Sequence, residues 1–213
     1  MAITKNILTS NTKGSIDNLV IVRRLGQTFY RRKPKHYHDA KTKNQLKSRT
    51  RLTAANEPLK PLAKYARFKY RKPGQTQRNA LMKRVMADAT AYKHNNWMIL
   101  PEKITISSGG LPPVNNLTVA SAKNHMIKIA WVDNSGYGDA KSNDEMFIIF
   151  YNPLCENNQV VEASIKSAHR SDSLCSKKVP ANWSGQTVYI YVYTVSYNTL
   201  FISDSKCLTA TAF

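Results

Sequence analysis

The segment from Phe29 to Leu52 has the residue types and spacing needed to bind phosphate. It carries nine Lys or Arg residues against a single acid, Asp39. The nine are Arg31, Arg32, Lys33, Lys35, Lys41, Lys43, Lys47, Arg49 and Arg51. Like charges this close repel one another, and the repulsion costs stability unless a polyanion neutralises it. We therefore expect a folded basic surface that binds nucleic-acid backbone; the alternative is a solvated basic face without a partner.

Aromatic and histidine side chains lie among these charges. Phe29, Tyr30 and Tyr37 have rings that can stack on bases, but aromatic residues of strands more often belong to a core, which we favour here. His36 and His38 flank Tyr37 at a spacing that chelates a metal only from a strand, and only Asp39 supports them. We expect no metal and no cofactor at this site.

A second group of oxygen donors lies between Asp133 and Asp139, where the sequence reads DNSGYGD. Alternating oxygen side chains and glycines suit a calcium loop, yet the spacing matches no EF-hand and no Glu closes it at the twelfth position. Asn, Asp and Gly also dominate turns. We favour a turn between two strands, without a metal.

No phrase in the sequence predicts catalysis. GxSxG, P-loop, HExxH and paired-carboxylate motifs are all missing. Cys155, Cys175 and Cys207 are widely spaced and form no CxxC pair, which predicts reduced, buried thiols and neither disulfides nor a zinc site. We expect a protein that is not an enzyme.

The positive charge of the chain is confined to its first half. Residues 1–105 carry 24 Lys or Arg and 5 Asp or Glu, a balance of +19, whereas residues 106–213 carry 8 of each. This asymmetry predicts two domains, a basic one at 1–105 and a neutral one at 106–213, with a phosphate-rich partner for the first. No apolar run is long enough for a signal peptide or for the roughly 20 residues of a membrane span, so we expect a cytoplasmic protein.

Three kinds of element must position the basic residues. Strands at Ser15–Val22 and Gln27–Arg32, with Leu25-Gly26 as the turn, predict a β-hairpin. Thr42 starts a helix, and Gln45 three residues later completes a capping box. We expect Pro58 and Pro61 to interrupt this helix, since both are compatible with the first turn of a second one.

The third predicted helix, Gln75–Tyr92, has apolar residues on one face. After Pro101 the chain consists of short apolar runs separated by turn residues, which predicts seven or eight antiparallel strands. In TVYIYVYTVS, the residues Val188, Ile190 and Val192 face one way and three tyrosines face the other. Exposed tyrosines there would suit a protein interface. The fold class is α+β: a basic hairpin with about three helices, then an antiparallel β-sandwich, immunoglobulin-like or fibronectin-like in preference to a jelly roll.

Several phrases taken together resemble a known family. They are TKGSIDNLVIVRR, TKNQLKSRTRL, AWVDNSGYGDAKSNDEMFIIFYNP, AHRSD and SDSKCL. In this order, over nearly the whole chain, they are similar to an uncharacterised family of bacterial proteins known only as a domain of unknown function. Its members share a W-x-D-N-S-G-x-G-x-A phrase. The resemblance implies a two-part architecture and brings no activity with it.

These features together favour a non-enzymatic structural or packaging protein. Its basic half would bind nucleic-acid backbone without sequence preference, and its neutral half would contact proteins or other copies of the chain. A basic part followed by a neutral β-sandwich is similar in layout to small viral coat proteins, and as a coat protein the chain would belong to a virion. The rival reading is a monomeric interaction or regulatory module in the cytoplasm, and an enzyme is a distant third.

Overall fold

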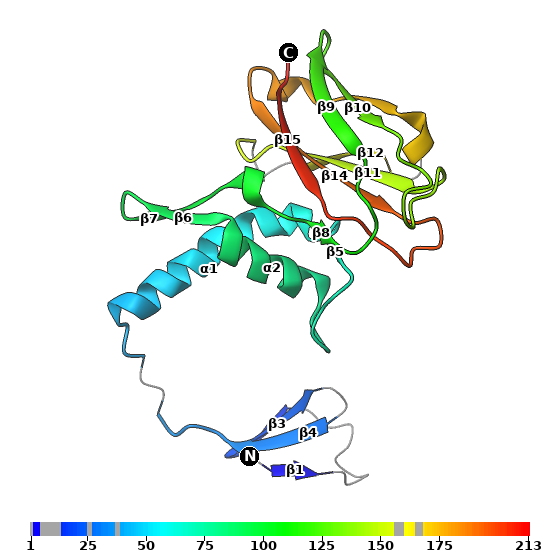
Figure 1. Ribbon diagram of the computed structural model, residues 1–213. Coiled ribbons are helices and arrows are strands. Elements are labelled where there is room, and N and C mark those ends of the chain that lie inside the picture. Colours follow the sequence, from blue (N-terminus) through cyan, green and yellow to red (C-terminus); the bar gives the residue numbers. More distant parts are fainter. Residues whose placement is uncertain (1, 5–13, 25–26, 37–38, 156–159, 165–167) are drawn as a thin grey trace. The chain divides into compact units, whose positions relative to one another are not determined.

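The computed structural model describes residues 2–4, 14–24, 27–36, 39–155, 160–164 and 168–213. By its internal contacts the chain forms two compact units, Met1–Gln45 and Leu46–Phe213. The boundary lies in the first turn of helix α1 (Lys43–Leu62), shown in Figure 1. In the described part of the chain, no helix has the length and apolar character needed to cross a membrane.

The first unit contains a four-stranded antiparallel sheet in the order β1-β4-β3-β2. Its strands are β1 (Ala2–Thr4), β2 (Gly14–Ile16), β3 (Leu19–Arg24) and β4 (Gln27–Arg32). The predicted hairpin is confirmed, since β3 pairs with β4 from Leu19↔Arg32 to Arg24↔Gln27. Its predicted turn, residues 25–26, lies outside the described residues. The predicted first strand is divided in two, because Asp17 has a φ of 47° and turns the chain between β2 and β3.

Helix α1 begins as predicted but does not end where Pro58 was expected to stop it. The backbone N–H of Thr42 donates to Gln45 Oε1 at 3.1 Å, and the N–H of Gln45 donates to Thr42 Oγ1 at 3.3 Å, so the capping box is confirmed. The helix continues through Pro58 to Leu62. Proline inside a helix costs about 3 kcal/mol. Leu59 and Leu62 are fully buried, and each contributes about 1.5–3 kcal/mol, which offsets that cost.

The predicted third helix is present but shorter. Helix α2 spans Gln77–Asp88, with Thr76 as its N-cap, and the chain then forms the hairpin β6 (Thr90–Lys93) and β7 (Asn96–Ile99). The turn residues His94 and Asn95 have φ values of 49° and 60°, as a two-residue hairpin turn requires. Tyr92 is therefore a strand residue, opposite Trp97, and not the last turn of a helix.

Two antiparallel sheets make up residues 107–213, here called the two-sheet region. One has the strand order β13-β10-β9 and the other β12-β11-β14-β15. The strands are β9 (Asn115–Ala122), β10 (Met126–Val132), β11 (Glu145–Tyr151), β12 (Val160–Ser164), β13 (Leu174–Lys178), β14 (Thr187–Val195) and β15 (Lys206–Thr211). A short strand, β8 (Ser107–Ser108), pairs in parallel with β5 (Arg67–Phe68).

A hydrophobic cluster joins these two sheets. It takes alternate residues from β10, β11 and β14, in keeping with the two-residue repeat of a strand. They include Ile127, Ile129, Trp131, Met146, Ile148, Phe150, Val188, Ile190 and Val192, all at most 3% exposed. The predicted valine and isoleucine face of β14 thus belongs to a core.

The opposite face of β14 is also buried, under what we call the helical layer, residues 46–106. Tyr191 and Tyr193 are 0% and 2% exposed, and they pack with buried residues of α1, α2 and the segment before β8. The expectation of exposed tyrosines is therefore wrong. The Tyr191 hydroxyl donates to the carbonyl of Pro101 at 2.7 Å, and that of Tyr193 to the carbonyl of Tyr65 at 2.9 Å.

This shared cluster bears on the domains that we expected at 1–105 and 106–213. Ala55, Leu59 and Leu81 of the helices pack in one cluster with Ile149 and Tyr191 of the sheet. The helical layer and the two-sheet region therefore belong to the same compact unit, and the division by contacts falls between residues 45 and 46. The excess positive charge therefore ends at a place in the chain where the hydrophobic packing is continuous.

Candidate nucleic-acid interface

The nine basic residues singled out from the sequence divide between the two compact units. Arg31, Arg32, Lys33, Lys35, Lys41 and Lys43 belong to the first unit, and Lys47, Arg49 and Arg51 to the second. Eight of the nine are exposed; only Arg51 is partly buried. Each group is therefore described within its own unit.

In the first unit, the basic residues follow the end of strand β4. Arg31 and Arg32 are the last two residues of the strand, and Lys33 and Lys35 continue it as exposed positions. The backbone N–H of Lys33 donates to the carbonyl of Asn18 at 2.6 Å, which fixes the chain just beyond the strand. Tyr37 and His38 lie outside the described residues. Phe29 and Tyr30 are partly buried, so neither ring is wholly in a core or fully exposed for stacking on a base.

In the second unit, Arg51 is used to hold the β6–β7 hairpin against α1. Its Nε donates to Thr90 Oγ1 at 2.9 Å, its Nη2 donates to the carbonyl of Met86, and its guanidinium lies 4.7 Å from the ring centroid of Trp97. The indole N–H of Trp97 donates to the carbonyl of Lys47 at 2.9 Å. The guanidinium of Arg51 thus has bonds within the fold, and its first role is to support the surface.

Lys47 and Arg49 remain on the surface of α1. The Nζ of Lys47 lies 4.0 Å from the ring centroid of Tyr92, which holds the ammonium above an aromatic ring while leaving the residue exposed. Arg49 is exposed on the same helix. The whole of α1 from Lys43 to Thr50 is exposed on every side. An exposed basic helix of this kind can lie along a phosphate backbone.

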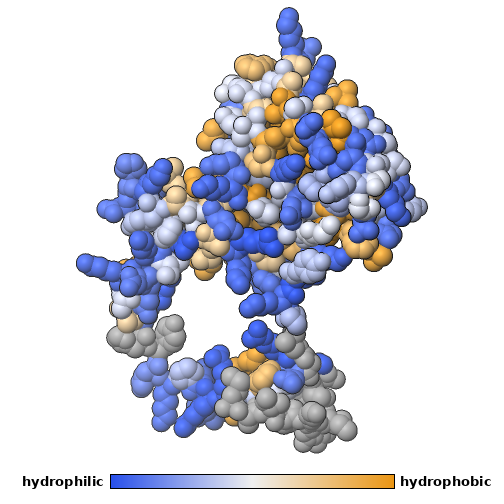
Figure 2. All heavy atoms as spheres, viewed as in Figure 1, coloured by the Kyte–Doolittle hydropathy of each residue, from blue (hydrophilic) through white to orange (hydrophobic). Residues whose placement is uncertain are grey.

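A further group of cations, which was not among the residues expected from the sequence, surrounds helix α2 (Gln77–Asp88). Lys72, Lys83 and Arg84 line a pocket of about 290 Å³ together with Tyr70, whose side chain is 74% exposed. Figure 2 shows hydrophilic side chains over much of the helical layer. The signal in the sequence is the pair Lys83-Arg84, which lies on the polar side of this helix.

The DNSGYGD loop is a turn held by side chains. Asp133 Oδ1 accepts from the backbone N–H of Ser135 at 2.9 Å and from its hydroxyl, and these bonds lower the pKa of Asp133. Asn134 Oδ1 accepts from Arg170, so this oxygen is already in use. Among the described residues, no three His, Cys, Asp or Glu side chains come together as metal ligands.

Arg170 is a buried residue whose importance the sequence did not reveal. It is 0% exposed and its Nε donates to Asp144 Oδ2 at 3.1 Å, within an equally buried ion pair. Its Nη2 donates to the carbonyl of Pro112 at 2.9 Å and to Thr194 Oγ1 at 3.2 Å. The indole N–H of Trp131 donates to the Arg170 carbonyl at 2.8 Å. Arg170 therefore ties together the loops at one end of the two-sheet region.

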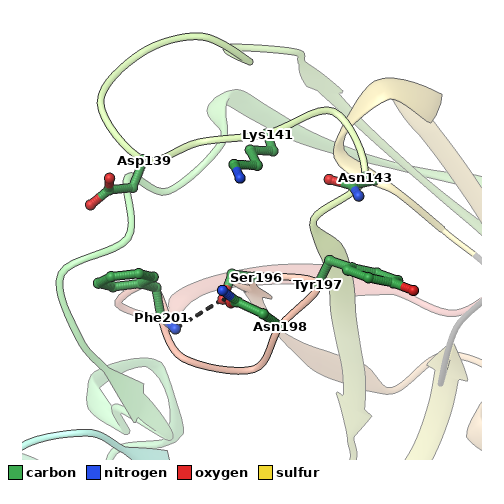
Figure 3. Close-up of a pocket in the computed structure, with 7 residues that line it drawn as sticks. All are labelled: Asp139, Lys141, Asn143, Ser196, Tyr197, Asn198 and Phe201. Carbon is green, nitrogen blue, oxygen red and sulfur yellow. Dashed lines mark hydrogen bonds between the residues drawn. The ribbon is translucent and has the colours of Figure 1, made fainter.

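A pocket of about 150 Å³ between two loops of the two-sheet region is shown in Figure 3. Its lining residues are Asp139, Lys141, Asn143, Ser196, Tyr197, Asn198 and Phe201. The Ser196 hydroxyl donates to Asn198 Oδ1 at 2.7 Å and accepts from the backbone N–H of Phe201 at 2.9 Å. Activating a serine requires a general base within hydrogen-bond reach, and no lining residue is a histidine. The two hydrogen bonds of the Ser196 hydroxyl thus go to an amide oxygen and a backbone N–H, neither of which is a general base.

The described cysteines do not form disulfides, and each is partly buried. Burial raises the pKa of the Cys207 thiol to about 12, with Glu102 adding to the effect, and burial also raises the pKa of Cys175. A thiol that stays protonated at neutral pH is a poor nucleophile. These two cysteines therefore have the properties of packing residues.

The chain combines two α-helices with several antiparallel sheets in its described residues. It belongs to the family described as a family of unknown function (DUF6266), which matches residues 11–209. This confirms the resemblance that its phrases indicated. No curated protein matches the chain.

Three solved structures are similar to parts of the chain. The fn3 domain of human collagen alpha-1(XX) chain has 12% identity and a TM-score of 0.35, over 48% of this chain and 86% of that one. A family 76 glycoside hydrolase from a bovine Bacteroides thetaiotaomicron strain has 18% identity and a TM-score of 0.37, over 48% of this chain and 21% of the hydrolase. The selenomethionine-substituted chicken interferon gamma receptor alpha chain has 14% identity and a TM-score of 0.33, over 55% of this chain and 56% of the receptor. The matches thus cover less than two thirds of the last two proteins.

Proposed function

We propose that this protein is a non-enzymatic nucleic-acid-binding protein of a structural or packaging kind. Its basic residues would hold the phosphate backbone without reading base sequence, and the two-sheet region would contact proteins, including other copies of the chain. Phosphate contacts fix position and carry no sequence information, which suits a surface built mainly of Lys and Arg.

One observation carries this proposal: the uncompensated charge of the helical layer. Residues 46–106 contain 14 Lys or Arg against three acids, Glu57, Asp88 and Glu102, so 14 − 3 leaves +11. Three acids neutralise at most three of the 14 cations, and 12 of the 14 are exposed. A polyanion that binds such a surface releases the counterions that otherwise surround both partners, and this release favours binding.

The proposed contacts are the exposed cations of both units. Within the segment Phe29 to Leu52 they are Arg31, Arg32, Lys33, Lys35, Lys41 and Lys43 in the first unit and Lys47 and Arg49 in the second. The other exposed cations of the helical layer, which include Lys60, Lys72, Lys83 and Lys93, extend the second group. Arg51 supports the second group through its bonds to Thr90 and Met86, so its removal is expected to act through the β6–β7 hairpin.

We further propose that the two-sheet region is an immunoglobulin-like or fibronectin-like sandwich. Its seven strands form antiparallel sheets of three and four. The chain passes from one sheet to the other between β10 and β11, between β12 and β13, and between β13 and β14. Crossings of this kind, with a shared core between the sheets, are typical of immunoglobulin-like sandwiches.

Binding to duplex DNA at several salt concentrations tests the nucleic-acid proposal. Two 30-base-pair duplexes of unrelated sequence are titrated with the protein between 50 and 200 mM NaCl. With six or more phosphate contacts, affinity is expected to fall by about 1,000-fold or more over this range, equally for both duplexes. Absence of binding at 50 mM, or an affinity that does not change with salt, would overturn the proposal.

Sedimentation velocity separates packaging from the rival reading, a monomeric interaction module. The proposal predicts that the protein forms large particles of defined size when nucleic acid is added. A 24.1 kDa monomer that binds nucleic acid without assembling would support the interaction module instead.

A further inference from the structure

The pocket beside helix α2 combines an exposed aromatic ring with three cations. Its volume of about 290 Å³ is just below the roughly 300–1,000 Å³ typical of small-ligand sites. Tyr70 and Lys72 come from the loop that precedes the helix, and Lys83 and Arg84 come from the helix itself. Neither Lys72 nor Lys83 has an ion-pair partner among the described residues.

The loop that carries Tyr70 and Lys72 is held in one shape by hydrogen bonds. The Nε of Arg71 donates to the carbonyl of Phe68 at 3.1 Å, and its Nη1 donates to the carbonyl of Gln75 at 2.6 Å. The backbone N–H of Gln75 donates to the carbonyl of Lys72 at 2.9 Å. Arg71 thus closes the loop from within, and its two neighbours are presented to the pocket in advance of any ligand. A site ordered in advance loses less entropy on binding.

The helix side of the pocket consists of two alanines, two basic residues and Asp88. Ala80, Lys83, Arg84 and Ala87 share one face of α2, since they lie three or four residues apart. The two alanines leave room for a planar group. The guanidinium of Arg84 lies 4.6 Å from the ring centroid of Phe68, which holds it beside the pocket.

Tyr70 differs from the exposed Tyr137 in its surroundings, because it lines a pocket with three cations, and the Nζ of Lys69 lies 6.0 Å from its ring centroid. Its side chain is 74% exposed, whereas Tyr191 and Tyr193 bury their rings and bond their hydroxyls. Every nucleobase has a flat face, and stacking on tyrosine is a sequence-tolerant way to hold single-stranded nucleic acid. Asp88 is the one acid that lines the pocket, and its negative charge disfavours a phosphate close to it. Its carboxylate can accept a hydrogen bond from the amino group of cytosine.

We propose that this pocket binds one base of a single-stranded nucleic acid. The base stacks on Tyr70 against the alanine face of α2, and the phosphates on either side of it contact Lys72, Lys83 and Arg84. The inference rests on the proposed function and deepens it, because a surface that contacts phosphates alone would not distinguish single strands with bases from the same backbone without them. An acidic protein segment would also be attracted to the three cations, but its carboxylates would not stack on the exposed ring of Tyr70.

The test compares two single-stranded DNA oligomers of equal length and charge, a 12-residue oligodeoxycytidylate and a 12-residue abasic strand. The full-length protein is expected to bind the first more tightly. Tyr70→Leu should weaken binding of the oligodeoxycytidylate by about 5-fold to 150-fold, the range found for loss of one base stack, and should leave the abasic strand unaffected. Tyr70→Trp should restore the preference.

Tyr137→Leu is the matched control, since Tyr137 is 73% exposed in a loop of the two-sheet region. It should change neither affinity, and thermal melting should show both leucine variants to be folded. Equal affinity of the parent for the two strands would overturn this inference and leave backbone binding intact. An equal loss for both strands in Tyr70→Leu would also overturn it. If neither strand nor duplex DNA binds, the proposed function fails and this inference fails with it.

Discussion

The helical layer and the two-sheet region share a hydrophobic cluster but differ completely in charge. The first carries +11 over residues 46–106, and the second carries eight cations and eight acids over residues 107–213. Tyr191 and Tyr193 of β14 are buried at the junction of the two regions, where they pack against the helical layer. Packing therefore does not explain the difference in charge. It is explained if only the helical layer faces a polyanion, while the two-sheet region serves as its support.

Arg170 of the two-sheet region and Arg78 of the helical layer differ in burial and in pairing. Arg170 in the two-sheet region is fully buried and paired with Asp144. Arg78 in the helical layer is exposed on α2, and its hydrogen bond to Asn56 Oδ1 is 3.4 Å long. A buried, paired arginine is part of the structure, whereas an exposed one contributes little to stability and is available to a ligand.

Removal of the helical layer is expected to have the largest effect. A chain of residues 107–213 exposes Ile149, Tyr151, Tyr191 and Tyr193, each of which contributes about 1.5–3 kcal/mol when buried. The sum equals a large part of the 5–15 kcal/mol by which typical domains are stable. We expect this fragment to show no cooperative unfolding in urea, whereas residues 40–213 should unfold cooperatively. A fragment of 107–213 that melts like the longer chain would show that the two regions are independent.

Loss of the buried ion pair between Arg170 and Asp144 is expected to have the second largest effect on the free energy of unfolding. Arg170→Ala leaves Asp144 charged and buried without its partner, which typically costs about 3–5 kcal/mol. The matched change in the helical layer, Arg78→Ala, should alter the free energy of unfolding by no more than about 0.5 kcal/mol. Urea denaturation of both variants measures the contrast. Similar losses in the two would remove the distinction between structural and available arginines.

A smaller effect is expected at the junction itself. Tyr191→Phe removes the hydrogen bond to the carbonyl of Pro101, which contributes about 0.5–1.5 kcal/mol. Burial raises the pKa of Tyr191 well above its usual value of 10.0. Because the folded state keeps the proton that the unfolded state loses, the parent is expected to lose stability as pH rises above about 10.

Tyr191→Phe should make this alkaline loss of stability less steep, as measured by thermal melting between pH 8 and 11. Tyr197→Phe is the control, since Tyr197 is 71% exposed. If the melting temperature falls equally steeply from pH 8 to 11 in the parent and in Tyr191→Phe, the burial of this hydroxyl is contradicted.

Features that depend on near neighbours could be predicted from the sequence. The β3–β4 hairpin, the capping box of Thr42 and Gln45, and the two faces of β14 are all confirmed, and each is set by residues within a few positions of one another. The exposure of most basic residues between Arg31 and Arg49 follows from their charge in the same way.

Features that depend on distant partners could not be predicted. The bond from Tyr193 to Tyr65 joins residues 128 positions apart, so nothing near Tyr193 in the sequence showed that it would be covered. Helix α1 passes through Pro58 because the apolar residues beyond it are buried in that same cluster. Arg51 has the charge of a phosphate ligand, but its partner Thr90 is 39 positions away.

The most direct test compares equal losses of charge from the two regions. One variant replaces Lys60, Lys72, Lys83 and Lys93 by Gln, and the other replaces Lys123, Lys128, Lys141 and Lys178; all eight residues are exposed. Both variants lose the same net charge, and the salt dependence of duplex DNA binding is measured for each. Our account predicts that the slope of log affinity against log salt falls in the first variant, by about 0.9 for each lysine that contacts phosphate, and is unchanged in the second. Equal falls in both variants would contradict it, because binding would then follow net charge and not the helical layer.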